Sequence, residues 1–202
     1  RDMQICLARG YGVDKQERCK NTLASVQALL GGQSIELYVE IPLDGIGALN
    51  DLLGGVTVTL LDDFTASDPT MTAGKTLTLT GQQAEILVRS RMSMAVGTNE
   101  ARMSRQRIFM DAAVPMIRER ISENSGFASE MLDSLSPYLT TNMVRGRMIN
   151  ELNKAYHYDV QPVEYLTGEH TIGDDGFVEF HAASQSAVDF VLSAFYTKRD
   201  AQ

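Results

Sequence analysis

The sequence predicts a layered α/β fold, and three observations lead to that prediction. Apolar residues recur with helical spacing in some segments and alternate with polar residues in others, and the two kinds of segment follow one another. Such an alternation is typical of helices layered on a sheet. The 202 residues can bury a sizeable core, and 44% hydrophobic with 22% charged residues is ordinary for a globular domain. We therefore expect one domain over residues 1–202.

The first part of the chain is expected to alternate between helices and strands. Asn21 is a suitable cap for a helix with an apolar stripe, and Thr80 with Gln83 forms a capping-box pattern for another. The expected segments are a short apolar stretch at Gln4–Ala8, helices at Thr22–Leu30 and Leu43–Leu53, strands at Ile35–Ile41 and Val56–Leu60, and a brief strand or turn at Gly74–Leu79.

The second part begins with a long helix at Asn99–Ser122, which starts polar and becomes apolar after Arg107. Its apolar residues surround the axis, which is typical of a buried helix, and Pro115 is expected to kink it. The remaining expected segments are helices at Glu130–Leu139, Asn142–Tyr156 and Ser184–Phe195, and strands at Val160–Leu166 and Phe177–His181.

A basic cluster at residues 79–109 is the candidate site, because the chain as a whole carries a net charge of -8. The cluster holds Arg89, Arg91, Arg102, Arg105 and Arg107 and two acidic residues, Glu85 and Glu100. Arg89 and Arg91 alternate, so their side chains point the same way if the chain is extended there. Arg102, Arg105 and Gln106 share one helical face. Since the planar arginine fork matches phosphate oxygens, the pattern predicts an anion site between two segments.

Charge and spacing exclude one class of function and leave other readings open. The acidic balance argues against nucleic-acid binding, which needs a basic face. Asp62–Thr72 is expected to be a solvated loop rather than a metal site, because its aspartates lack ligand spacing. Arg145 and Arg147 are expected on a solvated face rather than at a second phosphate site. Cys6 and Cys19 are either two buried thiols or a disulfide.

Four motifs together resemble the LytR-CpsA-Psr family: LNDLLGGVTV (49–58), GKTLTLTG (74–81), VRSR (88–91) and RMSRQ (102–106). The resemblance runs from about Gln4 to Tyr196. It implies a mixed β-sheet flanked by helices, with a strand and loop at Gln4–Gly12. Members are extracellular enzymes that move glycopolymers from a polyprenyl-pyrophosphate carrier onto the bacterial cell wall. We expect this chain to begin inside the domain, after the first strands of the sheet and after a membrane anchor.

The resemblance also implies roles for single residues. The positions that contact the pyrophosphate in the family match Arg89, Arg91, Arg102, Arg105 and Gln106, and all of these except Arg105 are expected to be catalytic. Arg1 matches a further pyrophosphate-binding arginine. Asn99 stands where the family usually has an aspartate, so Asp2 is the nearest candidate for the proton acceptor. Arg107 lies about 140° around the helix from Arg102 and is left out of the site.

The family uses magnesium, held by carboxylates on strands that we expect to precede this chain, so no metal ligand is predicted within it. Because the family works outside the cell, where thiols oxidise, the resemblance favours the disulfide. The apolar part of the long helix, after Arg107, has two readings. It is either core alone, or both core and the wall of a groove for the polyprenyl tail. The groove residues would be Ile108, Phe109, Ala112 and Met116.

The predicted function is that of a glycopolymer-peptidoglycan phosphotransferase at the extracellular face of the membrane. Its expected partners are a polyprenyl-pyrophosphate-linked glycopolymer, peptidoglycan and membrane lipid. The alternative is a non-catalytic module that binds the same glycolipid without transferring it. Transcriptional regulation finds no support, because the sequence contains no helix-turn-helix and no basic recognition helix.

Overall fold

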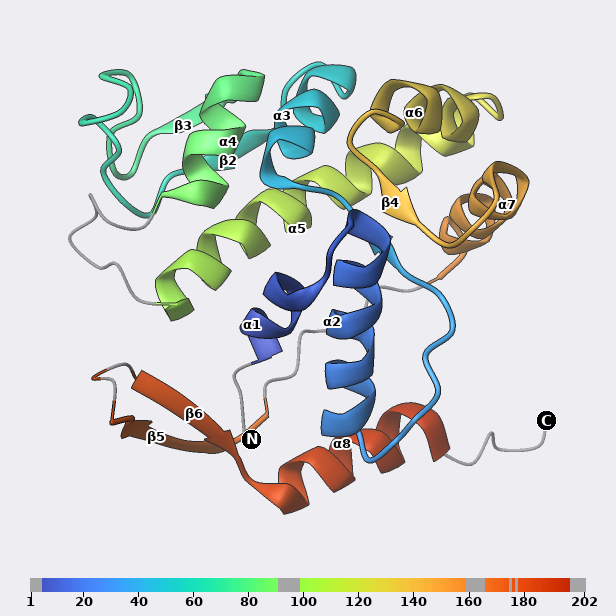
Figure 1. The fold of residues 1–202 in the computed structure, drawn as a ribbon. Coiled ribbons are helices and arrows are strands. Elements are labelled where there is room, and N and C mark those ends of the chain that lie inside the picture. The colour runs from blue at the N-terminus through green and yellow to red at the C-terminus, as the bar shows by residue number, and fades with distance from the viewer. Residues whose placement is uncertain (1–4, 91–98, 159–165, 175, 177, 197–202) are drawn as a thin grey trace. The chain divides into compact units, whose positions relative to one another are not determined.

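The computed structural model describes residues 5–90, 99–158, 166–174, 176 and 178–196. Its contacts divide the chain into two compact units, here called unit 1 and unit 2. Unit 1 comprises Arg1–Tyr38, Thr140–Asn142 and Asp159–Gln202, and unit 2 comprises Val39–Leu139 and Met143–Tyr158. Each unit contains helices and short strands, which confirms the predicted α/β class (Figure 1). That residues 1–202 form one domain stays a prediction.

Unit 1 contains helices and short antiparallel strands. Its elements are α1 (Ile5–Ala8), the 3-10 helix η1 (Arg9–Tyr11), α2 (Lys15–Leu29), β4 (Thr140–Thr141), β5 (Gly168–Ile172), β6 (Val178–Ala182) and α8 (Ser184–Tyr196). β5 pairs antiparallel with β6, with Glu169 opposite His181. The strand and loop that the resemblance implies at residues 4–12 differ from the structure, because residues 5–8 form an α-helix and residues 9–11 a 3-10 helix. Most of the strand predicted at 160–166 lies outside the described residues.

Helix α2 begins earlier than predicted. The Asp14 carboxylate accepts a hydrogen bond of 2.8 Å from the Glu17 amide and caps the helix at Lys15, so Asn21 lies inside it. The early turns have no apolar stripe, so the sequence pattern could not place them. Cys19 on this helix is buried. The side chain of Cys6 lies outside the described residues, and the disulfide stays a prediction.

Unit 2 carries the motifs of the basic cluster. Its elements are β1 (Val39–Glu40), α3 (Leu43–Leu52), β2 (Thr57–Thr59), β3 (Thr76–Thr78), α4 (Gly81–Arg89), α5 (Asn99–Glu123), α6 (Phe127–Leu135) and α7 (Arg145–Ala155). β2 pairs antiparallel with β3, with Thr57 opposite Thr78. The strand predicted at 35–41 is reduced to β1, and α5 runs through Pro115.

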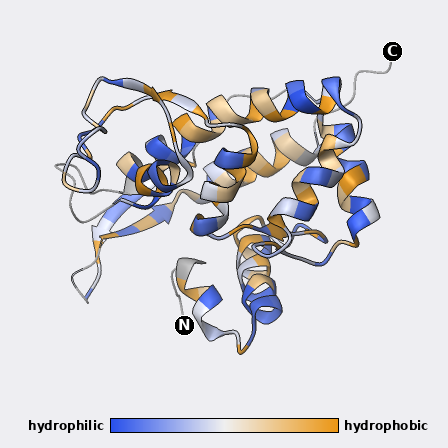
Figure 2. Cartoon of the chain, turned by 90° about the horizontal axis from the view of Figure 1, so that it is seen from above, coloured by the Kyte–Doolittle hydropathy of each residue, from blue (hydrophilic) through white to orange (hydrophobic). Residues whose placement is uncertain are grey.

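One hydrophobic core forms where the apolar faces of the unit 2 helices meet β2 and β3. Its members share very low exposure, and they include Leu53, Val56, Leu60, Phe64, Met71, Leu87, Val88, Phe109 and Phe127. The helices carry apolar and polar residues together along their length (Figure 2), as helices that bury one face do. In the described part of the chain, no helix is both long and apolar enough to span a membrane.

Asn50 joins α3 to the two strands and is fully buried. Its side-chain amide donates to the Leu79 carbonyl at 2.8 Å, and its oxygen accepts the Val56 amide at 2.9 Å. The bonds hold the start of β2 beside the end of β3, and residue 80 then caps α4, which begins at Gly81. Asn50 therefore sets where α4, the first segment of the basic cluster, leaves the sheet.

Candidate functional site

Helix α4 carries the first arginine of the cluster at its last position. The predicted capping box is present: the Gln83 amide donates to Thr80 Oγ1 at 3.3 Å, and the Thr80 amide donates to Gln83 Oε1 at 3.1 Å. Arg89 ends the helix with 61% of its side chain exposed. Its contact with Glu85 is long, at 3.8 Å, and such an exposed pair contributes little. The Arg89 guanidinium is therefore accessible to a ligand.

The first turns of α5 lie against the C-terminal end of α4, and the two helices pack together (Figure 1). Gln106 Nε2 donates to the Val88 carbonyl at 3.3 Å, and Arg105 Nη2 donates to the Ser90 carbonyl at 2.7 Å. Arg102 lies one turn earlier on the same face of α5. The structure thus brings the segment that carries Arg102 to the helix end that carries Arg89.

Arg102 is half-buried, and its Nε, like that of the fully buried Arg105, has no hydrogen-bond partner among the described residues. A buried donor of this kind needs an explanation, because an unsatisfied polar group costs free energy. For an arginine at the junction of two cationic segments, an anion is the partner that satisfies both its hydrogen bonds and its charge. The arrangement can therefore hold a phosphate group between the end of α4 and the start of α5.

Several predicted site residues cannot be placed. Arg1, Asp2 and Arg91 lie outside the described residues. Asn99 is the first residue of α5, but its side chain is also outside the described set. Their predicted roles stay predictions.

Arg105 does not fit its predicted role as a pyrophosphate ligand. Its side chain is 1% exposed, Nη1 bonds Asp62 Oδ2 at 2.8 Å, and Nη2 bonds the Ser90 carbonyl. Both terminal nitrogens thus already have acceptors inside the protein. The helical spacing placed Arg105 on the correct face but could not show that Asp62, which is distant in sequence, meets it there.

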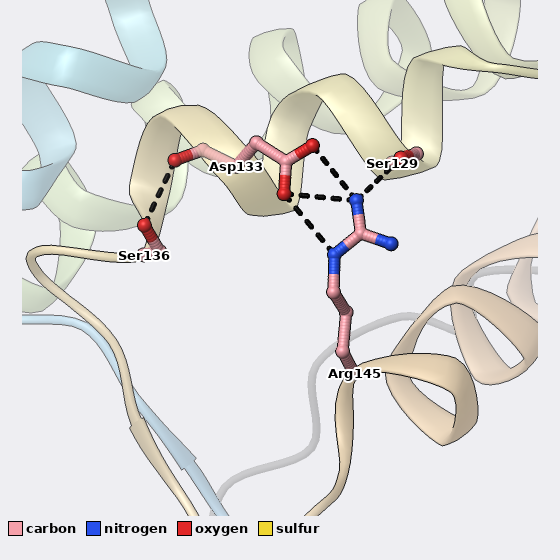
Figure 3. A network of polar contacts seen from close by, with 4 residues as sticks. All are labelled: Ser129, Asp133, Ser136 and Arg145. Atoms are coloured by element: carbon pink, nitrogen blue, oxygen red, sulfur yellow. Dashed lines mark hydrogen bonds and ion pairs between the residues drawn. The ribbon is translucent and has the colours of Figure 1, made fainter.

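Two other arginines lie apart from the cluster's shared face. Arg107 forms an i,i+4 ion pair of 3.1 Å with Asp111, as expected for a residue outside the site. Figure 3 shows Arg145 at the start of α7 reaching both carboxylate oxygens of Asp133 and the hydroxyl of Ser129 on α6. Arg145 and Asp133 are both more than half exposed, which favours the predicted solvated face over a second phosphate site.

The predicted lipid groove falls on residues that pack in or against the core. Phe109 is 1% exposed inside the core of unit 2, and Ile108, Ala112 and Met116 are half-buried against it. Phe109 is therefore a core side chain in this structure. The groove itself stays a prediction.

A magnesium ion, which the family resemblance implies, needs several oxygen ligands. In the described residues, no group of three or more His, Cys, Asp or Glu side chains lies together to hold a metal. Asp63 and Asp68 instead close turns of the loop after β2. Hydrogen bonds from Thr65 lower the pKa of Asp63, and those from Thr70 and Gln83 lower the pKa of Asp68. The described residues do not fit a magnesium site.

The chain is similar to known proteins in sequence profile and in fold. The profile of the LytR_cpsA_psr family matches residues 18–190. No curated protein matches the chain in sequence. Among solved structures, Bacillus subtilis TagV is 18% identical with a TM-score of 0.69, and the match covers 95% of this chain and 72% of TagV.

Two further structures are similar in fold. Protein gbs0355 of Streptococcus agalactiae is 19% identical with a TM-score of 0.76, covering 98% of this chain and 68% of that one. A structure described as TagT bound to LI-WTA is 19% identical with a TM-score of 0.70, covering 94% and 69%. At such identities the likeness demonstrates a shared fold.

Proposed function

The chain belongs to the LytR_cpsA_psr family, and on that premise we propose that it is a transferase that attaches a glycopolymer to the bacterial cell wall. The finer proposal is that the donor is a polyprenyl-pyrophosphate-linked glycopolymer and the acceptor is peptidoglycan. The solved structure of TagT bound to LI-WTA supports a donor of this class, because it is a complex of a protein with the same fold.

The observation that carries the proposal is the state of Arg102. It presents a buried, unpartnered Nε among the described residues, next to the helix end where Arg89 is accessible. Gln106 lies on the same face of α5; one hydrogen of its amide bonds the Val88 carbonyl, and the other is the donor proposed for the ligand. Together these groups offer charged, oriented donors to a diphosphate, which is the ligand that the proposed donor would bring.

The proposed reaction is phosphoryl transfer. An acceptor hydroxyl oxygen attacks the phosphorus that carries the glycopolymer, and the bond from that phosphorus to the bridging oxygen breaks. Polyprenyl phosphate leaves with the electron pair. Negative charge grows on the bridging and non-bridging oxygens, so fixed guanidinium groups stabilise the transition state. Arg89, Arg91 and Arg102 are assigned that role together with Gln106. Arg1 is proposed to bind the pyrophosphate, and Asp2 remains the proposed acceptor of the hydroxyl proton.

A role for magnesium and the cellular location of the protein are proposed from family resemblance alone. Since the described residues give magnesium no ligand set, no step of the mechanism uses it. A rate of transfer that rises with added magnesium would support its participation, and an equal rate in EDTA would contradict it. The proposed location is the outer face of the cell membrane, where the lipid carrier and peptidoglycan meet.

The test is a transfer assay with purified protein, lipid-linked glycopolymer and peptidoglycan, comparing Arg102→Ala with Arg107→Ala. Both variants remove one arginine from the same helix. We expect Arg102→Ala to lower transfer by about 10²- to 10³-fold, as loss of one transition-state donor does. Arg107→Ala should retain nearly the wild-type rate. Wild-type protein that binds the donor but transfers nothing would support the glycolipid-binding module instead.

A further inference from the structure

We infer that Arg105 and Asp62 form a positioning pair, which fixes the end of α4 against α5 so that Arg89 and Arg102 face one diphosphate. This inference rests on the proposed function, since it assigns residues that organise the proposed site. Neither residue of the pair touches the ligand.

The burial of Arg105 is the first observation. At 1% exposed, Arg105 is the largest fully buried side chain in the described part of the protein. Burying a guanidinium is costly unless it is paired and hydrogen-bonded. Asp62 Oδ2 at 2.8 Å supplies the charge for Nη1, and the Ser90 carbonyl at 2.7 Å supplies an acceptor for Nη2, while Nε has no partner among the described residues.

The place of the Ser90 carbonyl is the second observation. Ser90 is the C-cap of α4 and leaves the helix in an extended conformation, with φ −56° and ψ 130°. Its carbonyl belongs to the peptide bond that leads to residue 91. By holding this carbonyl, Arg105 fixes the direction in which the chain departs immediately after Arg89. The carbonyl end of a helix is also partly negative, which favours a cation there.

Asp62 connects the pair to the sheet. It follows β2 by a few residues, and its side chain is 25% exposed. One guanidinium thus joins the loop after β2, the end of α4 and the first turns of α5. Only arginine has a planar fork that reaches two acceptors at once, whereas the single ammonium of lysine is a point charge. Buried ion pairs are weak evidence for stability, so fixing the geometry of the site is the better account of this one.

Substitution of Asp62 separates positioning from direct binding, because the two roles predict effects of opposite sign. Asp62→Asn removes a negative charge close to an anion site, and on Coulomb grounds alone this tightens anion binding. If Arg105 were a ligand, releasing it from Asp62 would tighten binding further. If the pair positions Arg89 and Arg102, Asp62→Asn weakens binding roughly tenfold or more, as loss of an orienting partner does.

The experiment measures binding of farnesyl diphosphate to the full 202-residue chain by calorimetry, with each variant checked by circular dichroism to be folded. The second arm is a double-mutant cycle of Arg105→Lys with Arg89→Lys. Arg118→Lys is the matched control, because Arg118 lies on the same helix and donates to a backbone carbonyl, that of Tyr156, at 2.9 Å.

We expect Asp62→Asn and Arg105→Lys each to raise the Kd of folded protein. Arg105→Lys should have a smaller effect once Arg89 is replaced, because only the positioning of Arg102 then remains to be lost. Arg118→Lys should leave the Kd unchanged in both backgrounds. Tighter binding by Asp62→Asn, or additive losses in the cycle, would overturn the inference. Non-additive losses in a protein that transfers no polymer would support the positioning pair and refute the proposed function. Absence of diphosphate binding by the wild type would refute both.

Discussion

Replacing Asn50 with alanine tests whether this residue holds the sheet that leads to the site. The substitution removes the partner of two backbone groups, the Val56 amide and the Leu79 carbonyl, on residues that are 0% and 2% exposed. An unsatisfied buried group costs about 1–3 kcal/mol, so the loss is about 2–6 kcal/mol. That is a large part of the roughly 5–15 kcal/mol that stabilises a typical domain.

The assay is urea unfolding of the Asn50→Ala variant, followed by circular dichroism and compared with Asn150→Ala. Asn150 is exposed on α7, so its replacement should change the free energy of unfolding by less than about 0.5 kcal/mol. A denaturant slope equal to that of the wild type would show that stability alone has changed. A cost below about 1 kcal/mol for Asn50→Ala would refute the assigned role, because one lost hydrogen bond would then suffice to explain it.

Three further predictions concern the core, the surface and the acid response. Phe109→Ala should cost about 3–5 kcal/mol of stability as a buried core aromatic, whereas Met110→Ala on the exposed face should cost little; equal unfolding midpoints would contradict the core assignment. Arg145→Ala should cost at most about 1 kcal/mol, since its ion pair is exposed, and leave donor affinity unchanged; weaker donor binding would indicate a second phosphate site. Because its hydrogen bonds hold the pKa of Asp68 below the ordinary 3.8, the unfolded chain takes up the proton first as the pH falls. The stability that Asp68 contributes is therefore present above pH 3.8 and is lost as the pH falls through the folded pKa. The urea midpoint of the wild type should therefore fall at low pH, and Asp68→Asn should make this fall smaller. An unchanged pH profile in Asp68→Asn would contradict the contribution assigned to Asp68.

Local sequence signals predicted the elements that depend on local chemistry. The capping box at Thr80 and Gln83 fixes the start of α4, and the predicted α3 differs from the structure by one residue at its end. The first turns of α2 were not predicted, because they follow the Asp14 cap without an apolar stripe that would indicate a helix. The strand predicted from the alternation at 35–41 is mostly absent, since alternation alone does not supply a pairing partner.

For the site, the sequence predicted which arginines share a face but not what each one contacts. Arg102 and Arg105 carry the same charge one turn apart, and each has an unpartnered Nε among the described residues, yet both terminal nitrogens of Arg105 are bonded inside the protein. The difference arises from Asp62 and the Ser90 carbonyl, which the fold brings from other segments. Nothing in the sequence around Asp62 indicates that it pairs with Arg105. Likewise, nothing around Asn50 indicates its buried hydrogen bonds.

The most direct test of the central claim is a crystal structure of the protein in complex with a polyprenyl diphosphate. The account predicts phosphate oxygens within about 2.7–3.2 Å of guanidinium nitrogens of both Arg89 and Arg102, with the Arg102 Nε satisfied by the ligand. A diphosphate bound elsewhere, with the side chains of Arg89 and Arg102 directed to separate regions of solvent, would contradict it.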